Sequence, residues 1–118
     1  MPHTITDEMR RCINECHSCH EICLEAVAHC LQRGGKHAAA AHITALLDCA
    51  ESCDVSANFM LRSSEHQRRV CEVCADVCEA CAASCDELAD DDIMRRCAEE
   101  CRRCAESCRK MAGTAAHA

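Results

Sequence analysis

Cysteine recurs along this chain with the period of an α-helix. Sixteen of the 118 residues are Cys, and most follow one another at steps of three and four positions. Such steps place a row of side chains on one helix face. A helical bundle ordinarily carries Leu or Ile at these inward positions. The rows are Cys12, Cys16, Cys19, Cys23 and Cys30; Cys49 and Cys53; Cys71, Cys74, Cys78, Cys81 and Cys85; and Cys97, Cys101, Cys104 and Cys108.

The residues that break helices divide the chain into four segments. Proline occurs only at Pro2, and glycine only at Gly34, Gly35 and Gly113. We expect helices over residues 6–32, 36–61, 65–88 and 91–111, with capping signals at residues 6–9, 63–65 and 90–92. Short connections make neighbouring helices antiparallel. The predicted fold is all-α: an antiparallel up-down-up-down four-helix bundle with a Cys-lined core, forming a single domain over residues 1–118.

The second predicted helix continues the inward row with fewer thiols. Its inward positions are His42, Leu46, Cys49, Cys53, Ser56 and Met60. Leu46 and Ser56 interrupt the thiols, which predicts less metal beside this helix. A second apolar stripe lies next to the row and favours an oligomer, because exposed apolar patches mark interfaces; a broad core face is the alternative. This stripe consists of Ile43, Leu47, Ala50, Ala57 and Leu61.

Three roles are open to so many inward cysteines. Free Cys packs as a small apolar side chain, but sixteen such residues are far more than a core needs. Disulfides need Cβ atoms ~3.5–4.5 Å apart, whereas neighbours on one helix face lie ~5–6 Å apart. A two-coordinate metal ion with bonds of ~2.3 Å holds its sulfurs roughly 4.6 Å apart. Thiolates four residues apart can reach this separation, as in Cys12/Cys16, Cys19/Cys23, Cys49/Cys53, Cys74/Cys78, Cys81/Cys85, Cys97/Cys101 and Cys104/Cys108.

Softness and charge favour copper(I) among the thiophilic metals. Thiolate sites select Cu(I), zinc or iron–sulfur clusters. The bacterial iron–sulfur run ends in Cys-Pro, which is absent here, and structural zinc is typical of loops. One Cu⁺ per thiolate gives a neutral core, whereas four Zn²⁺ on sixteen thiolates leave a charge of −8. The predicted cofactor is therefore Cu(I), multiple ions per chain, with zinc or another soft metal as the alternative.

Composition excludes several other classes of function. The formal net charge of −7 disfavours nucleic acid as a partner, and no apolar run approaches the ~20 residues of a membrane span. Arg10 and Arg11 are followed by Cys-Ile-Asn-Glu-Cys rather than an apolar segment, so we expect no export signal and a cytoplasmic location. No nucleophile–base set or nucleotide loop indicates an enzyme. A copper chaperone, the remaining alternative, needs one or two exposed ligand pairs.

Residues 12–23, 71–85 and 97–108 carry the densest rows of Cys. These three blocks resemble the bacterial copper storage proteins, which are four-helix bundles with a Cys-lined interior. The resemblance covers nearly the whole chain and is closest to the cytosolic members. It implies high-capacity Cu(I) storage, a homo-tetramer of bundles and a ligand role for all sixteen cysteines.

Methionine and histidine suggest where copper enters. Antiparallel helices bring Met9, Met60 and Met111 to one end of the bundle, where thioethers would pass Cu(I) inward; a simple apolar plug is the alternative. His42 with Met94, at the opposite end, is the competing entrance. The remaining histidines considered are expected to be solvated: His3, His17, His20, His29 and His117.

Overall fold

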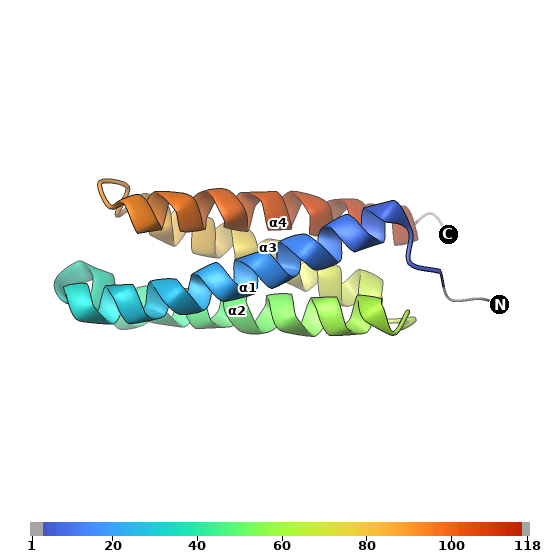
Figure 1. Ribbon diagram of the computed structural model, residues 1–118, viewed down its shortest axis with the longest axis horizontal. Coiled ribbons are helices and arrows are strands. Elements are labelled where there is room, and N and C mark those ends of the chain that lie inside the picture. The colour runs from blue at the N-terminus through green and yellow to red at the C-terminus, as the bar shows by residue number, and fades with distance from the viewer. Residues whose placement is uncertain (1–3, 117–118) are drawn as a thin grey trace.

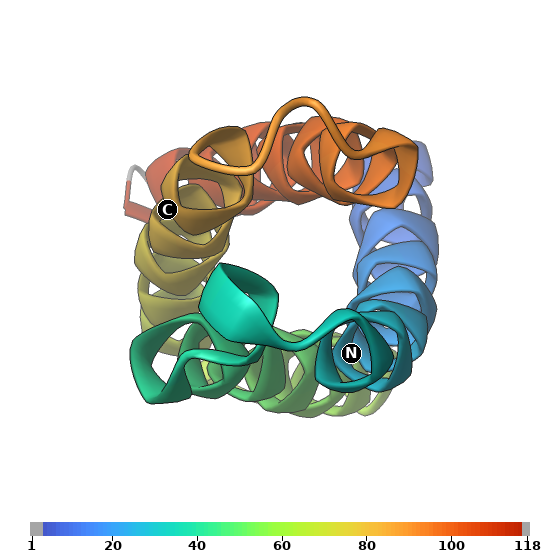
Figure 2. The same cartoon turned by 90° about the vertical axis from the view of Figure 1, so that its left-hand side faces the viewer.

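The computed structural model describes residues 4–116 of the chain, with side chains described for residues 4–113. Four antiparallel helices form an up-down-up-down bundle (Figure 1), which confirms the predicted fold. Seen end-on, the helices stand at the corners of a square, with α1 beside α2 and α4 (Figure 2). The elements are α1 (Asp7–Arg33), the 3₁₀ turn η1 (Gly35–Ala38), α2 (Ala40–Leu61), α3 (Gln67–Asp86) and α4 (Asp92–Ala116).

Two of the predicted caps are confirmed. The Thr6 side chain accepts a hydrogen bond of 3.1 Å from the Met9 N–H at the start of α1. Asp91 Oδ1 accepts from the backbone N–H groups of Ile93 (2.9 Å) and Met94 (3.2 Å) at the start of α4. Both side chains satisfy N–H groups that lack partners inside a helix.

The other predicted boundaries need correction. Residues 36–38 belong to η1 rather than to α2, because Gly34 and Gly35 adopt positive φ (69° and 57°) and redirect the chain. Ser64 does not cap α3; its Oγ accepts from the His66 N–H at 3.1 Å within the turn. Helix α4 continues through Gly113, since one glycine costs a helix only about 1 kcal/mol.

The core is a thin column of small side chains. The molecule extends over 52 × 20 × 20 Å, and the inward row predicted for α2 is buried along its whole length. Buried alanines flank the thiols and bring the helices close together: Ala26, Ala50, Ala57, Ala75, Ala82, Ala98 and Ala105. Within the described residues, no helix combines the length and apolar character that crossing a membrane requires.

The second apolar stripe of α2 is divided between core and surface. Ala50 and Ala57 are buried, and Ile43 packs against the core. Leu47 and Leu61 remain 45% and 42% exposed. The stripe is therefore partly the broad core face that was the alternative interpretation, and only its two leucines offer apolar surface.

Histidines on α1 also join helices. His29 Nε2 lies 2.7 Å from Asp91 Oδ2, and His20 Nδ1 lies 2.8 Å from the Ala50 carbonyl oxygen. The expectation of solvated side chains is wrong for these two, because they occupy the seams that α1 forms with its neighbours. His17 is exposed, as expected. His3 and His117 lie outside the described residues.

Candidate metal centre

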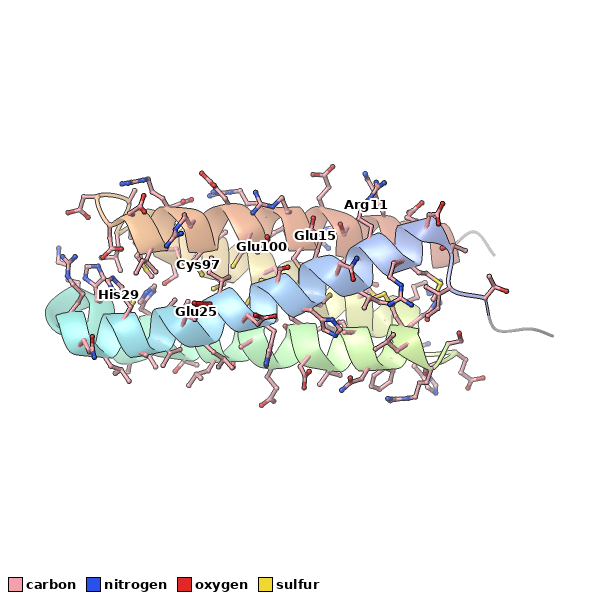
Figure 3. The ribbon with its side chains drawn as sticks, in the orientation of Figure 1. Arg11, Glu15, Glu25, His29, Cys97 and Glu100 are labelled. Carbon is pink, nitrogen blue, oxygen red and sulfur yellow. The ribbon has the colours of Figure 1, made fainter. Side chains whose placement is uncertain are left out.

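All sixteen cysteine side chains are buried, and they line the interior of the bundle, which we call the lumen. Sulfur atoms lie between the ribbons, whereas charged side chains radiate outward (Figure 3). Among the thiols in close contact, the shortest sulfur–sulfur distance is 3.5 Å, between Cys19 and Cys49. A disulfide requires about 2.0 Å. The thiols are therefore free, in close contact, and available to a metal ion.

The thiols gather into overlapping groups whose sulfur atoms all lie within 4.8 Å of one another. Four groups contain four thiols each, and we number them from the end of the bundle that holds the chain termini. They are the first tetrad (Cys16, Cys74, Cys104, Cys108), the second (Cys19, Cys53, Cys78, Cys104), the third (Cys19, Cys23, Cys49, Cys101) and the fourth (Cys23, Cys81, Cys97, Cys101). A triad of Cys12, Cys71 and Cys108 precedes them.

Most close sulfur contacts join different helices. Cys16 of α1 lies 3.7 Å from Cys104 of α4, and Cys53 of α2 lies 3.7 Å from Cys78 of α3. Pairs within a single helix are also close: Cys74/Cys78 lie 3.8 Å apart, and Cys19/Cys23, Cys97/Cys101 and Cys104/Cys108 lie within 4.8 Å. The pairs predicted four residues apart are therefore only part of the arrangement, because side chains that converge on one axis meet those of the facing helices.

No cation compensates for charge in the lumen. Among the described residues no Lys or Arg side chain is buried. A hydrogen bond with Cys104, further hydrogen bonds with neighbouring thiols and burial together raise the pKa of Cys53 far above its ordinary value. Isolated charges are costly in such an environment. The column as a whole must therefore keep most of its protons or exchange them for metal cations.

Cys30 stands apart from the tetrads, in a different set of donors. His42 Nε2 lies 3.4 Å from Cys30 Sγ, and Met94 Sδ lies 3.7 Å from the same sulfur. The other ring nitrogen of His42, Nδ1, lies 2.7 Å from Ser84 Oγ. An Nδ1–H that donates to Ser84 leaves the Nε2 lone pair directed at Cys30. Thiol, imidazole and thioether thus converge where α1 ends and α2 begins.

The surroundings keep both Cys30 and His42 neutral in the metal-free protein. Burial, and then the negative charge of Asp91, raise the pKa of Cys30 to about 11. Burial, with the nearby His37, lowers the pKa of His42. A surface pocket of about 500 Å³, lined in part by Lys36, His42 and Ser84, reaches this place.

Asp91 fastens the same end of the bundle. Its Oδ2 lies 2.7 Å from His29 Nε2, 2.9 Å from Arg33 Nη1 and 3.3 Å from His37 Nε2. Burial by itself raises the pKa of Asp91, but hydrogen bonds from His29 and from the Met94 N–H lower it to about 2. One carboxylate therefore joins the end of α1, the turn η1 and the start of α4.

The opposite end carries the three methionines. Met9, Met60 and Met111 extend the rows of Cys at the end that holds both chain termini (Figure 1). Their exposures are 7%, 0% and 6%. The side chains are thus packed into the end of the core.

Fold and lumen together define a cysteine-lined helical bundle, a class of protein suited to holding soft metal ions. The chain belongs to the copper storage protein family, whose sequence model matches residues 5–113. The match confirms the resemblance seen in the three Cys-rich blocks. Copper(I) storage is accordingly the function of the family to which this bundle belongs.

Solved structures give the same result. A protein of Nitrosospira multiformis is 46% identical, with a TM-score of 0.86 over 92% of this chain and 99% of that chain. The Cu(I)-bound copper storage protein 3 of Bacillus subtilis is 33% identical, with a TM-score of 0.84 over 90% and 99%. A cytosolic copper storage protein of Streptomyces lividans is 31% identical, with a TM-score of 0.85 over 91% and 93%. None of the curated proteins matches this chain.

Two contributors to the site could not be recognised from the sequence. Ser84 orients His42, yet it sits among ordinary small residues of α3, and only the approach of α2 to α3 reveals its role. Asp91 was expected only as a helix cap, whereas its second oxygen gathers side chains from α1 and η1. No spacing rule within one helix relates residues on different elements.

Proposed function

We propose that this chain is a cytoplasmic, high-capacity store of Cu(I) in which the sixteen cysteines are the metal ligands. The observation that carries the proposal is the continuous column of buried thiols without a buried cation among the described residues. Each Cu⁺ that replaces one thiol proton leaves the charge of the lumen unchanged. Many ions can therefore accumulate where divalent ions would leave excess negative charge.

Relatives support a high capacity. A Streptomyces lividans copper storage protein holds five coppers in one structure and is loaded with ten copper equivalents in another. The five-copper structure is described as that of a cytosolic protein, and the cytosol keeps thiols reduced. We assign the present chain to the cytoplasm on this basis, as one storage unit spanning residues 1–118.

The arrangement supports neither an enzyme nor a chaperone. A reactive catalytic thiol is partly exposed in an electropositive place, whereas all sixteen thiols here are buried. A chaperone passes on one or two ions from an accessible pair of ligands. With a formal charge of −7, the chain also offers little attraction to nucleic acid.

Competition for Cu(I) tests the proposed function. Reduced, metal-free protein is titrated anaerobically with Cu(I) against a strong chromophoric chelator. Storage predicts that about ten or more ions per chain are withheld from the chelator, because bridging thiolates let a row of sulfurs hold many ions. A capacity of one or two ions would instead identify a chaperone.

For copper uptake we propose the end that carries His42. The pocket above His42 opens to solvent, and beyond the imidazole lie Cys30 and Met94. At the other end Met9, Met60 and Met111 are packed into the core, which favours their alternative role as an apolar plug. They remain the rival entrance, and rates of Cu(I) uptake by variants of each end distinguish the two.

We also propose that the bundles assemble into a homo-tetramer, as the family resemblance implies. A groove of about 450 Å³ follows the α2–α3 seam, where Val55 and Val73 are 37% and 58% exposed. Asp48, Glu51 and Arg69 line the same groove, and none of the three takes part in an ion pair within the described residues. A second copy would cover the valines and pair the charges. Sedimentation as a 12.9 kDa species would refute the assembly.

A further inference from the structure

The tetrads have a geometry that a chain of two-coordinate copper sites does not require. In the third tetrad, Cys19 lies 3.5 Å from Cys49 and 3.8 Å from Cys101. Cys101 also lies 3.8 Å from Cys49 and 4.0 Å from Cys23. Four sulfurs bound tetrahedrally to Zn²⁺ at ~2.3 Å are ~3.8 Å apart. Four of the six sulfur separations in this tetrad are therefore already close to those around a bound Zn²⁺, and all six are within 4.8 Å.

We propose that the lumen has a second cargo: thiophilic divalent ions such as Zn²⁺ and Cd²⁺, each bound as a mononuclear, tetrahedral four-thiolate site in one tetrad, with two such sites per chain. The inference uses the proposed ligands but does not depend on copper as the cargo. Each Zn²⁺ takes four thiolates and releases four protons, so the filled tetrad carries a charge of −2. Binding is accordingly weaker than for Cu(I) and rises more steeply with pH.

The capacity follows from the thiols that the tetrads share. The first and second tetrads share Cys104, the second and third share Cys19, and the third and fourth share Cys23 and Cys101. Tetrads that are not neighbours share no thiol. A thiolate that bridged two ions would join their sites into one cluster, so separate mononuclear sites need four thiolates each. At most two of the four tetrads can therefore be filled together as mononuclear sites.

The geometry also selects which two tetrads fill. The third tetrad has the most complete set of sulfur separations near the tetrahedral value. Once it is filled, the second and fourth tetrads have lost thiols to it, and only the first remains whole. Within the first tetrad, Cys16 lies 3.7 Å from Cys104 and 3.9 Å from Cys108. We assign the two divalent ions to the third and first tetrads.

Because neighbouring tetrads share thiols, single Cys→Ala substitutions should change the capacity for divalent ions by different amounts. Cys101→Ala removes the third and fourth tetrads, and the remaining two share Cys104, so the capacity falls to one ion. Cys104→Ala removes the first and second tetrads and has the same effect. Cys74→Ala removes only the first tetrad and leaves the second and fourth, which share nothing, so two ions still bind. Cys30→Ala touches no tetrad and also keeps two.

The experiment is a titration of the reduced full-length chain with Zn²⁺ against a chromophoric chelator, with Co²⁺ as a spectroscopic probe of tetrahedral four-thiolate sites. We expect two ions in the wild type, Cys74→Ala and Cys30→Ala proteins, and one ion in Cys101→Ala and Cys104→Ala. No binding, four ions per chain, or two ions retained by a folded Cys101→Ala would overturn the proposal. Circular dichroism checks that each variant folds, and the wild-type capacity decides the question if the variants do not.

A parallel Cu(I) titration separates this proposal from the storage function. Many Cu(I) ions with no Zn²⁺ would reject the second cargo and leave copper storage intact. Two Zn²⁺ with only one or two Cu(I) would reject high-capacity copper storage and leave the divalent sites. Because the two titrations use the same preparation, an error in thiol oxidation state would lower both capacities together.

Discussion

The two ends of the bundle extend the same column of thiols with different donors. At the end with the chain termini, Met9, Met60 and Met111 are almost fully buried and pack against the last cysteines. At the other end, His42 lies beneath a pocket of about 500 Å³ and is 5% exposed. A thioether in a packed core must move before an ion can pass. An imidazole at the floor of a pocket is already within reach of an incoming ion.

The two ends of the bundle differ in how their metal donors are packed, and not only in how soft those donors are. Both ends carry sulfur, since Met94 lies beside Cys30 at the end with His42. Within the described residues, the buried imidazoles lie at that end, and the lowered pKa of His42 keeps its lone pair available at neutral pH. Donors that need no deprotonation bind Cu(I) loosely and hand it on. One end is therefore suited to admit copper, and the other to close the lumen.

Removing the imidazole gives the largest expected effect. His42→Ala should slow Cu(I) uptake roughly tenfold or more, since losing only the hydrogen-bond partner of a metal ligand typically costs 10–100-fold. The final capacity should fall by no more than about one ion, because the sixteen thiols are unchanged. Stopped-flow measurement of Cu(I) transfer from a weak chelator gives the rate.

The matched control changes the opposite end. Replacing Met9, Met60 and Met111 by Leu keeps their volume and removes the sulfur. Uptake by this triple variant should match that of the wild type. Slow uptake in the triple variant together with normal uptake in His42→Ala would move the entrance to the methionine end.

The carboxylate that fastens the His42 end can be tested separately. Asp91→Asn keeps a helix-capping side chain but removes the charge that attracts His29 and Arg33. We expect a loss of about 1 kcal/mol in the free energy of unfolding at neutral pH. Toward the methionine end, Arg109 pairs with Asp76 and joins α3 to α4, but no described carboxylate there gathers three elements as Asp91 does.

The pH dependence gives this prediction a sign. The pKa of Asp91 is lowered from its ordinary 3.8 to about 2 in the folded protein. Its charge therefore contributes stability above pH 3.8, and the contribution disappears as the pH falls toward 2. Thermal unfolding should show wild type and Asp91→Asn converging over that range. A constant difference between them would mean that the charge is not the cause.

Sequence reasoning succeeded wherever the direction of a side chain depends on one helix. The period of 3.6 residues fixes which residues of a helix face inward, so the burial of all sixteen cysteines and of His42 was predictable. The same argument misjudged His20 and His29, because they lie on seams between helices. Whether a flanking residue meets solvent or a neighbouring helix depends on packing that the sequence pattern does not contain.

The spacing of residues along the chain could not predict which side chains of different helices meet. Cys30, His42 and Met94 come from three helices, and their meeting depends on the relative register of those helices. The register of α1 against α2 depends on η1, whose residues 36–38 were predicted as the first turn of α2. The thiol tetrads depend on register in the same way. Spacing rules therefore identified the ligands but not their grouping.

Loosening His42 should have a smaller effect than removing it. Ser84→Ala removes the oxygen that lies 2.7 Å from His42 Nδ1 and leaves the imidazole in place. The ring loses its fixed orientation but keeps its lone pair. Uptake should slow about threefold, less than the 10–100-fold typical when a ligand of a resident metal loses its hydrogen-bond partner, because the entering ion is held only briefly. Ser84→Thr retains the hydroxyl and should restore most of the rate. Equal rates for Ser84→Ala and His42→Ala would mean that the hydroxyl itself contacts the incoming ion.

The smallest effect is expected when all metal is absent. Either end can act as an entrance only if the bundle is assembled before copper arrives. Protonated thiols pack as small apolar side chains, and the sixteen cysteines are fully buried alongside Leu46, Met60 and Met94. Circular dichroism of reduced, metal-free protein should therefore show the same helix content as the copper-loaded form. A largely unfolded metal-free spectrum, as a zinc finger gives, would mean that copper builds the bundle, and neither end could then act as a preformed entrance.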